Sequence, residues 1–224
     1  FQYVFLCILV LFLFIVPSLI EKEGGIRLPD TLEIIILLFI FAAEILGEIQ
    51  EFYVQIPFWD TLLHTLNGFL AAAVGLSLVE ILNNSERVAM KLSPFFIAVV
   101  AFCFSMTVGV MWEFAEFGAD MLFGMDMQKD TVVHEIHSVM LDPAGGQTPY
   151  AIEDIHQVVI DGQEMELDGY LDIGLTDTMK DLFVNFIGAI VFSVGGYFSM
   201  KHGKGKNWMK NFVPEKAYRF SEGA

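Results

Sequence analysis

The sequence predicts an all-α polytopic membrane protein, with five visible transmembrane helices and a small β-rich extracytoplasmic insert between the last two. Two observations predict this fold class. Of the 224 residues, 55% are hydrophobic, and the mean hydropathy is +0.58, whereas soluble domains are roughly 45–50% apolar. The apolar residues also form five runs, each close to the ~20 residues that cross a bilayer as a helix.

The five runs define the predicted spans in chain order. The first begins at Phe1 without a methionine or a basic region, so we expect a span in a chain trimmed at its start, and six spans in the full protein. Cys7 and Cys103 lie inside apolar runs, which predicts small buried side chains. The predicted spans are 1–20, 31–53, 58–82, 93–123 and 176–200.

Residues 124–175 form a long acidic segment between the last two predicted spans. Residues 155–160 alternate between apolar and polar, Asp161-Gly162 follows, and residues 163–167 alternate again. This pattern predicts a β-hairpin around a type I′ turn. We therefore expect a small β-rich cap in this insert.

Basic residues indicate the orientation, because lysine and arginine are retained on the cytoplasmic side. Ten of the 12 lysines and arginines lie in the first connection, the third connection and the tail 201–224, which share one side of a five-span thread. Only Lys129 and Lys180 lie on the other side. We expect a cytoplasmic tail and an insert on the outer side.

Ionisable residues inside the predicted spans are the main functional signal. Each costs at least ~2.5–3.5 kcal/mol near the bilayer centre and therefore indicates function by default. At ~1.5 Å of rise per residue, Glu48, His64, Glu116 and Asp181 fall roughly 8–11 Å below the outer surface, and Glu44 and Glu113 about 15–16 Å below it. Acids nearer the span ends are equally consistent with solvated interface residues.

A bound cation would compensate this charge, because several carboxylates cannot all stay ionised in a low-dielectric pocket. Oxygen-rich ligation with one imidazole suits Zn²⁺, Mn²⁺ or Fe²⁺, and Mg²⁺ or Ca²⁺ if the histidine stays out. Protons shared between carboxyls or water would be other forms of compensation. The predicted ligands of a divalent metal ion are His64, Glu113, Glu116, Asp181, Glu48, Asp60 and Asp177.

Three motifs carry a resemblance to a known family: Asp60-x3-His64-x3-Gly68, the run from Trp112 to Phe117, and Asp177-Thr178-x2-Asp181. The chain resembles the YjdF-like family of uncharacterised bacterial polytopic inner-membrane proteins over its last four spans. It departs from their pattern in the long insert and in Phe117, where we expect tryptophan. The resemblance implies a compact six-span protein of the bacterial cytoplasmic (inner) membrane and supplies no reaction.

Three function classes remain open. The first is a metal-binding membrane protein, which ranks first. The second is a cation or proton translocator using the same acids, although no acid continues the path through the inner halves of the spans. The third is a structural or partner-binding membrane protein. No nucleophile, phosphate-loop or dinucleotide motif is present, so enzymatic activity is left open.

The expected partners follow from the same composition. They are the lipid bilayer and a further copy of the chain or another membrane subunit. The net charge of −16 argues against nucleic acid, because phosphate binding requires a basic face. Three further histidines, His134, His137 and His156, lie in the insert; His134 and His137 are interpreted as exposed loop residues, with a second metal site there as the less favoured alternative.

Overall fold

The computed structural model describes residues 2–24, 26–83, 91–202, 212 and 215–216. Most of the predicted tail and Arg87 of the third connection lie outside these described residues. The chain divides into two compact units, one formed by residues 1–112 with 181–224 and the other by residues 113–180.

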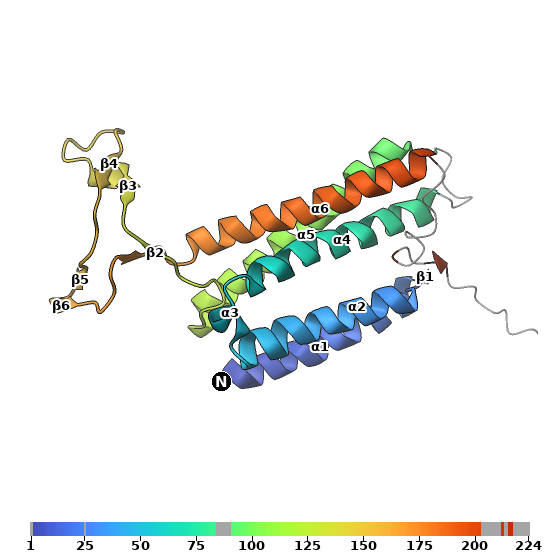
Figure 1. Ribbon diagram of the computed structural model, residues 1–224, viewed down its shortest axis with the longest axis horizontal. Helices are drawn as coiled ribbons and strands as arrows, with labels where there is room; N and C mark the ends of the chain where they lie inside the picture. Colours follow the sequence, from blue (N-terminus) through green and yellow to red (C-terminus); the bar gives the residue numbers. More distant parts are fainter. Residues whose placement is uncertain (1, 25, 84–90, 203–211, 213–214, 217–224) are drawn as a thin grey trace, which may run out of the picture. The chain divides into compact units, whose positions relative to one another are not determined.

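Helices build the first unit (Figure 1). Their positions follow the predicted apolar runs closely. A two-stranded antiparallel pair joins β1 (Ile26–Arg27) to β8 (Glu215–Lys216). The helices are α1 (Gln2–Gly24), α2 (Asp30–Ile40), the π-helix η1 (Phe41–Ile49), α3 (Phe52–Gln55), α4 (Trp59–Asn83), α5 (Pro94–Phe123) and α6 (Leu175–His202), of which α5 ends and α6 begins in the second unit.

Three helices within the described residues are long and apolar enough to cross a membrane: Trp59–Glu80, Pro94–Phe123 and Leu175–His202. The predicted count of five spans is therefore not confirmed. The second predicted run differs most from expectation, because it is divided between α2 and η1 and ends at Ile49.

The second predicted run ends at a change of backbone conformation just after Ile49, next to Gly47. The Gln50 N–H donates to the carbonyl of Ile45, five residues back, and Glu51 then takes a left-handed backbone with a φ of 61°. A Cβ on Gly47 would lie 2.3 Å from the Tyr53 ring, so the glycine leaves room for that ring against the helix. Glu51 therefore lies outside η1, immediately before α3.

Alanines and larger apolar side chains together form the core between α4, α5 and α6. Phe192 of α6 packs its ring edge-on against Phe69 of α4, with 4.8 Å between ring centroids. Leu32 of α2 packs against Leu70 of α4 in a second cluster. The main core cluster consists of Ala72, Ala73, Leu76, Ile97, Ala101 and Phe192.

Large apolar side chains remain exposed along the helices, among them Leu11 and Phe12 on α1 and Val191 on α6. Such rows suit contact with lipid, since a soluble monomer rarely exposes contiguous apolar surface of this kind. Cys7 and Cys103 are also exposed, so the prediction that they are buried was wrong. They lie within the apolar runs on helix faces that other helices do not cover.

The second unit contains short strands between the end of α5 and the start of α6 (Figure 1). β5 pairs with β6 around Asp161 and Gly162, whose φ values of 51° and 79° suit a type I′ turn. This is the place where the sequence predicts a hairpin, although only two residues on each side form the ladder. The antiparallel pairs are β2 (Val132–Val133) with β7 (Tyr170–Leu171), β3 (Ile136–Ser138) with β4 (Tyr150–Ile152), and β5 (Val159–Ile160) with β6 (Gln163–Glu164).

Asp172 connects the segments at the two ends of this unit through hydrogen bonds. The Asp172 carboxylate accepts hydrogen bonds from the backbone N–H groups of Thr131 and Thr176, at 3.0 and 2.8 Å. Burial alone would raise the pKa of Asp172, but these hydrogen bonds outweigh it and hold the pKa below its usual value. Asp172 is therefore an ionised cap that joins β7 to the start of α6.

Candidate metal centre

Glycines bring α4 and α6 into backbone contact. A Cβ on Gly68 would lie 2.0 Å from the carbonyl oxygen of Asn185, and a Cβ on Gly188 would lie 2.0 Å from that of Thr65. The two helices run parallel, because His64, Asn67 and Leu76 of α4 meet Asp181, Asn185 and Gly196 of α6 in the same order. Side chains one turn earlier on each helix, His64 and Asp181, are therefore brought together.

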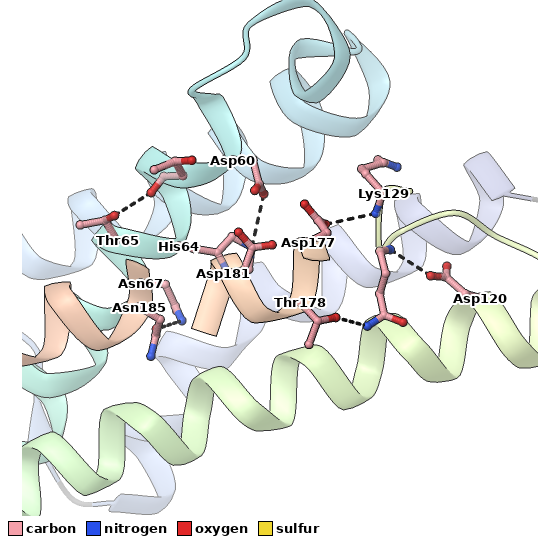
Figure 2. A network of polar contacts seen from close by, with 12 residues as sticks. Asp60, His64, Thr65, Asn67, Asp120, Lys129, Asp177, Thr178, Asp181 and Asn185 are labelled. Atoms are coloured by element: carbon pink, nitrogen blue, oxygen red, sulfur yellow. Dashed lines mark hydrogen bonds and ion pairs between the residues drawn. The ribbon is translucent and has the colours of Figure 1, made fainter. Parts of the chain in front are cut away.

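His64 lies between two carboxylates in the first unit (Figure 2). Its Nε2 is 3.4 Å from Asp60 Oδ1, one turn earlier on α4, and 3.8 Å from Asp181 Oδ2 on α6. One ligand atom from each of the three side chains lies within 4.8 Å of the other two. Asp181 is only 1% exposed and His64 is 8% exposed, while Asp60 is half-buried.

These separations suit one metal ion. Ligand atoms held about 2.1 Å from a tetrahedral ion lie about 3.4 Å apart. Two ionised carboxylates and one neutral imidazole carry two negative charges, which a divalent cation neutralises. This balance matters where charge is poorly solvated, because an uncompensated buried charge is costly.

An amide pair lies one turn further along the same two helices. Asn67 Nδ2 donates to Asn185 Oδ1 at 3.0 Å (Figure 2), and Asn185 is almost fully buried. The Ser105 hydroxyl of α5 donates to the Gly68 carbonyl at 2.7 Å. These contacts fix the relative rotation of the helices and so support the geometry of Asp60, His64 and Asp181.

A mostly apolar cavity of about 210 Å³ adjoins His64. Glu44, on the π-helix η1, also lines it and is 2% exposed. Its Oε2 has no hydrogen-bond partner among the described residues. The remaining lining residues are Leu13, Phe39, Ile40, Ala43, Tyr53, Leu63, Asn67, Val108 and Trp112.

The structure thus brings together three of the seven predicted ligands, Asp60, His64 and Asp181. Glu48 lies half-buried on η1 in the same unit and is not among the residues that line the cavity described above. Glu113 and Glu116 lie on the part of α5 that belongs to the second unit, and both are buried. Convergence of all seven groups stays a prediction.

Asp177, the last predicted ligand, takes part in the local structure of the second unit. One of its carboxylate oxygens accepts from the Lys129 backbone N–H at 3.1 Å (Figure 2). Asp120 acts similarly, accepting from the N–H groups of Met127 and Gln128 at 2.6 and 2.9 Å. Both acids connect the insert to the end of a helix. For acids near the span ends, the sequence leaves such an interface role open beside a role in metal binding.

Sequence reasoning missed one cluster in the second unit. His134, His156 and Asp168 also offer ligand atoms within 4.8 Å of one another. His137, which the sequence groups with His134, instead pairs with Glu135 at 2.5 Å. No local spacing could have revealed the cluster, because its members come from three separate segments of the insert.

Comparison with known proteins places the chain in a family. Residues 2–202 match the family described as "Predicted membrane protein (DUF2238)". The chain belongs to the DUF2238 family. The YjdF-like resemblance is consistent with membership of DUF2238, but the YjdF-like name is not confirmed.

A relative with no described activity also matches part of the chain. An uncharacterised protein from Thermotoga maritima is 27% identical over 104 residues, which cover 46% of this chain and 52% of that protein. The chain therefore spans about half the length of the curated relative it matches. No solved structure matches. DUF2238 membership identifies a membrane protein and leaves its activity to be inferred from the site.

Proposed function

We propose that this membrane protein binds a divalent metal cation through Asp60, His64 and Asp181. The observation that carries the proposal is the meeting of two carboxylates and one imidazole within 4.8 Å, with Asp181 almost fully buried. A divalent ion would neutralise the two carboxylates and occupy the space between their oxygens and His64 Nε2. Glu48, Glu113, Glu116 and Asp177 are proposed as further ligands of the same ion.

The ligand set favours particular metals. One imidazole with two carboxylates suits Zn²⁺, Mn²⁺ or Fe²⁺, whereas Mg²⁺ and Ca²⁺ prefer oxygen ligands alone. Binding by Asp60, His64 and Asp181 alone would leave at least one coordination position, which a further protein ligand, water or a small ligand could occupy. Because His64 also lines the apolar cavity, a ligand held in that cavity could reach the ion.

The membrane arrangement belongs to the same proposal. α1 has 23 residues, and α2 with η1 continues from Asp30 to Ile49, which at ~1.5 Å per residue is about 30 Å. Both are then spans, giving five with α4, α5 and α6. The basic connections support an inner-membrane location with the insert outside and the C-terminus in the cytoplasm.

Elemental analysis of the purified full chain in detergent tests the metal. We expect at least about one equivalent of a divalent transition metal per chain, retained without added salt. His64→Ala and Asp181→Asn should each lower the affinity at least about tenfold, because even supporting groups around a metal contribute 10–100-fold. Calorimetric titration of the chelator-treated protein would measure this loss.

Two control variants separate ligation from general damage. His202→Ala removes an exposed histidine at the end of α6, whose ring contacts the Phe198 carbonyl. Glu44→Gln removes a buried carboxylate that lies outside the cluster of Asp60, His64 and Asp181. Both should keep the wild-type affinity. Folded wild-type protein that binds no divalent metal would overturn the proposal.

A second candidate function is cation or proton translocation, favoured by one observation. Glu44 and His64 line the same cavity, and both can exchange protons. A pH-dependent ion flux in liposomes that is lost in Glu44→Gln would support this alternative. Absence of both metal and flux would favour a structural or partner-binding protein.

A further inference from the structure

The second unit holds a cluster of two histidines and an aspartate that the buried centre does not use. His134 follows β2, His156 lies just before β5, and Asp168 lies just before β7. All three side chains are exposed. The segments that carry them are therefore accessible to an ion from solvent.

Backbone hydrogen bonds hold these three segments in place. β2 pairs with β7, with Val133 opposite Tyr170, so His134 lies near the residues that precede Tyr170. The Ile155 N–H donates to the His134 carbonyl at 2.9 Å, which places His156 beside His134. Ile155 is itself buried, so this contact is anchored in the unit.

Gly169 permits the close approach of Asp168 to the histidines. Its φ is +141°, and a Cβ there would lie 2.5 Å from Val132 Cγ1 and 3.3 Å from His134 Nδ1. Any other residue would push this segment away from β2. The glycine thus places its neighbour Asp168 next to both rings.

Each histidine ring makes one polar contact that fixes its orientation. His134 Nδ1 lies 2.9 Å from the Ile155 carbonyl oxygen, which only accepts, so Nδ1 carries the proton and Nε2 keeps its lone pair. His156 Nδ1 lies 2.6 Å from Asp168 Oδ1. A ligating histidine typically holds its other ring nitrogen against a carbonyl or a carboxylate, as His134 does with the Ile155 carbonyl.

The distance between the rings also fits one ion. Their centroids are 5.2 Å apart, with 41° between the ring planes. Two imidazoles bound at about 2.1 Å to one tetrahedral ion have centres about 5 Å apart. The surrounding charge favours a cation, because residues 124–175 contain eleven acidic residues and one basic residue, Lys129.

We propose that His134, His156 and Asp168 form a second divalent-cation site, selective for imidazole-preferring ions such as Zn²⁺ over Mg²⁺ and Ca²⁺. The ion takes the place of the proton held between His156 Nδ1 and Asp168 Oδ1, and His134 Nε2 provides the third ligand. That proton is released to solvent as the ion binds, so binding weakens as the pH falls. Occupancy joins three segments of the insert that are otherwise held by short strands.

Chemical modification of the wild-type full chain tests this site without any substitution. Diethyl pyrocarbonate modifies accessible histidines, and mass spectrometry reports each one separately. We expect Zn²⁺ to protect His134 and His156 at least about tenfold, while the neighbouring His137 continues to react. Mg²⁺ at the same concentration should protect none of the three. Equal modification of the three histidines with Zn²⁺ present would overturn the proposal.

Variants then separate this site from the buried one. In a His64→Ala background, zinc titration should still show one binding event, which His156→Ala and Asp168→Asn weaken at least about tenfold. His137→Ala is the matched control and should keep the affinity. If His137→Ala weakens binding as much as His156→Ala, the zinc is held by insert histidines in general and the proposed site is wrong. The binding event in the His64→Ala background does not depend on the buried centre, so either proposal can fail alone.

Discussion

Replacing Gly68 with alanine is expected to separate α4 from α6 and to weaken metal binding at the proposed site of Asp60, His64 and Asp181. The new Cβ would lie 2.0 Å from the Asn185 carbonyl oxygen, and that atom belongs to the backbone, so no side-chain rotation relieves the overlap. Reaching an ordinary contact of 3.4 Å requires the helices to move apart by about 1.4 Å.

The magnitude follows from this displacement. Overpacking of a close-packed interface costs about 1–3 kcal/mol, and alanine recovers roughly 0.5–1 kcal/mol through its better helix propensity. Loss of the Asn67–Asn185 hydrogen bond would cost about 0.5–1.5 kcal/mol more. We therefore expect a net loss of about 1–3 kcal/mol, or about 2–4 °C in Tm for each kcal/mol.

The metal centre should respond as well, because Asp181 lies one turn before Asn185. A shift of 1.4 Å would widen the 3.8 Å gap between His64 Nε2 and Asp181 Oδ2 to about 5 Å, too wide for one ion to bridge. Metal affinity should fall at least about tenfold. Circular dichroism during heating and competition with a chelator would measure the two effects.

Two further variants make this test decisive. Gly188→Ala creates the same 2.0 Å overlap from the opposite helix, against the Thr65 carbonyl oxygen, and should behave like Gly68→Ala. Gly118→Ala is the control, since a Cβ there meets no atom of the described residues within 4 Å. If all three variants melt at the same temperature and bind metal equally, the argument from close helix packing is refuted.

Three other predictions concern the insert and the topology. Gly162→Val should strain a position with a φ of 79° and loosen the β5–β6 hairpin, and unchanged resistance of the insert to protease would count against this. In a background without Cys7 and Cys103, an impermeant thiol reagent should label Ala144→Cys but not Asn207→Cys in intact cells; the reverse pattern would refute the proposed orientation. The hydrogen bond from His156 lowers the pKa of Asp168 below 3.8, so its contribution to insert stability is present above that pH and is lost as the pH falls through the lower, folded-state pKa. Hydrogen exchange of β7 amides should therefore show an acid-dependent loss of protection that Asp168→Asn lacks.

The sequence predicted the positions of the helices well, because hydropathy reports directly which segments avoid water. It also placed Asp60, His64 and Asp181 among its candidate ligands, since ionisable residues stand out within apolar runs. The end of the second run at Ile49 could not be predicted. It coincides with a left-handed Glu51 and with the Tyr53 ring lying against Gly47, neither of which periodicity encodes.

The second cluster shows a different limit of sequence reasoning. His134 and His137 are close in the chain, and so attract attention together, yet the structure pairs His134 with His156 and leaves His137 with Glu135. The register of β2 with β7 decides this outcome. Strands of two residues carry too little alternation for a pattern to reveal which segment they join.

The pairing of α4 with α6 has a consequence for the order of synthesis. Asn67 and Asn185 are 118 residues apart, so at ~5–20 residues per second the ribosome completes the second partner about 6–24 s after the first. During this interval Asp60 and His64 enter the bilayer without Asp181, and the buried cluster does not exist. If the proposed function holds, metal loading follows translation of α6, and a chain that ends before α6 has Asp60 and His64 but no Asp181.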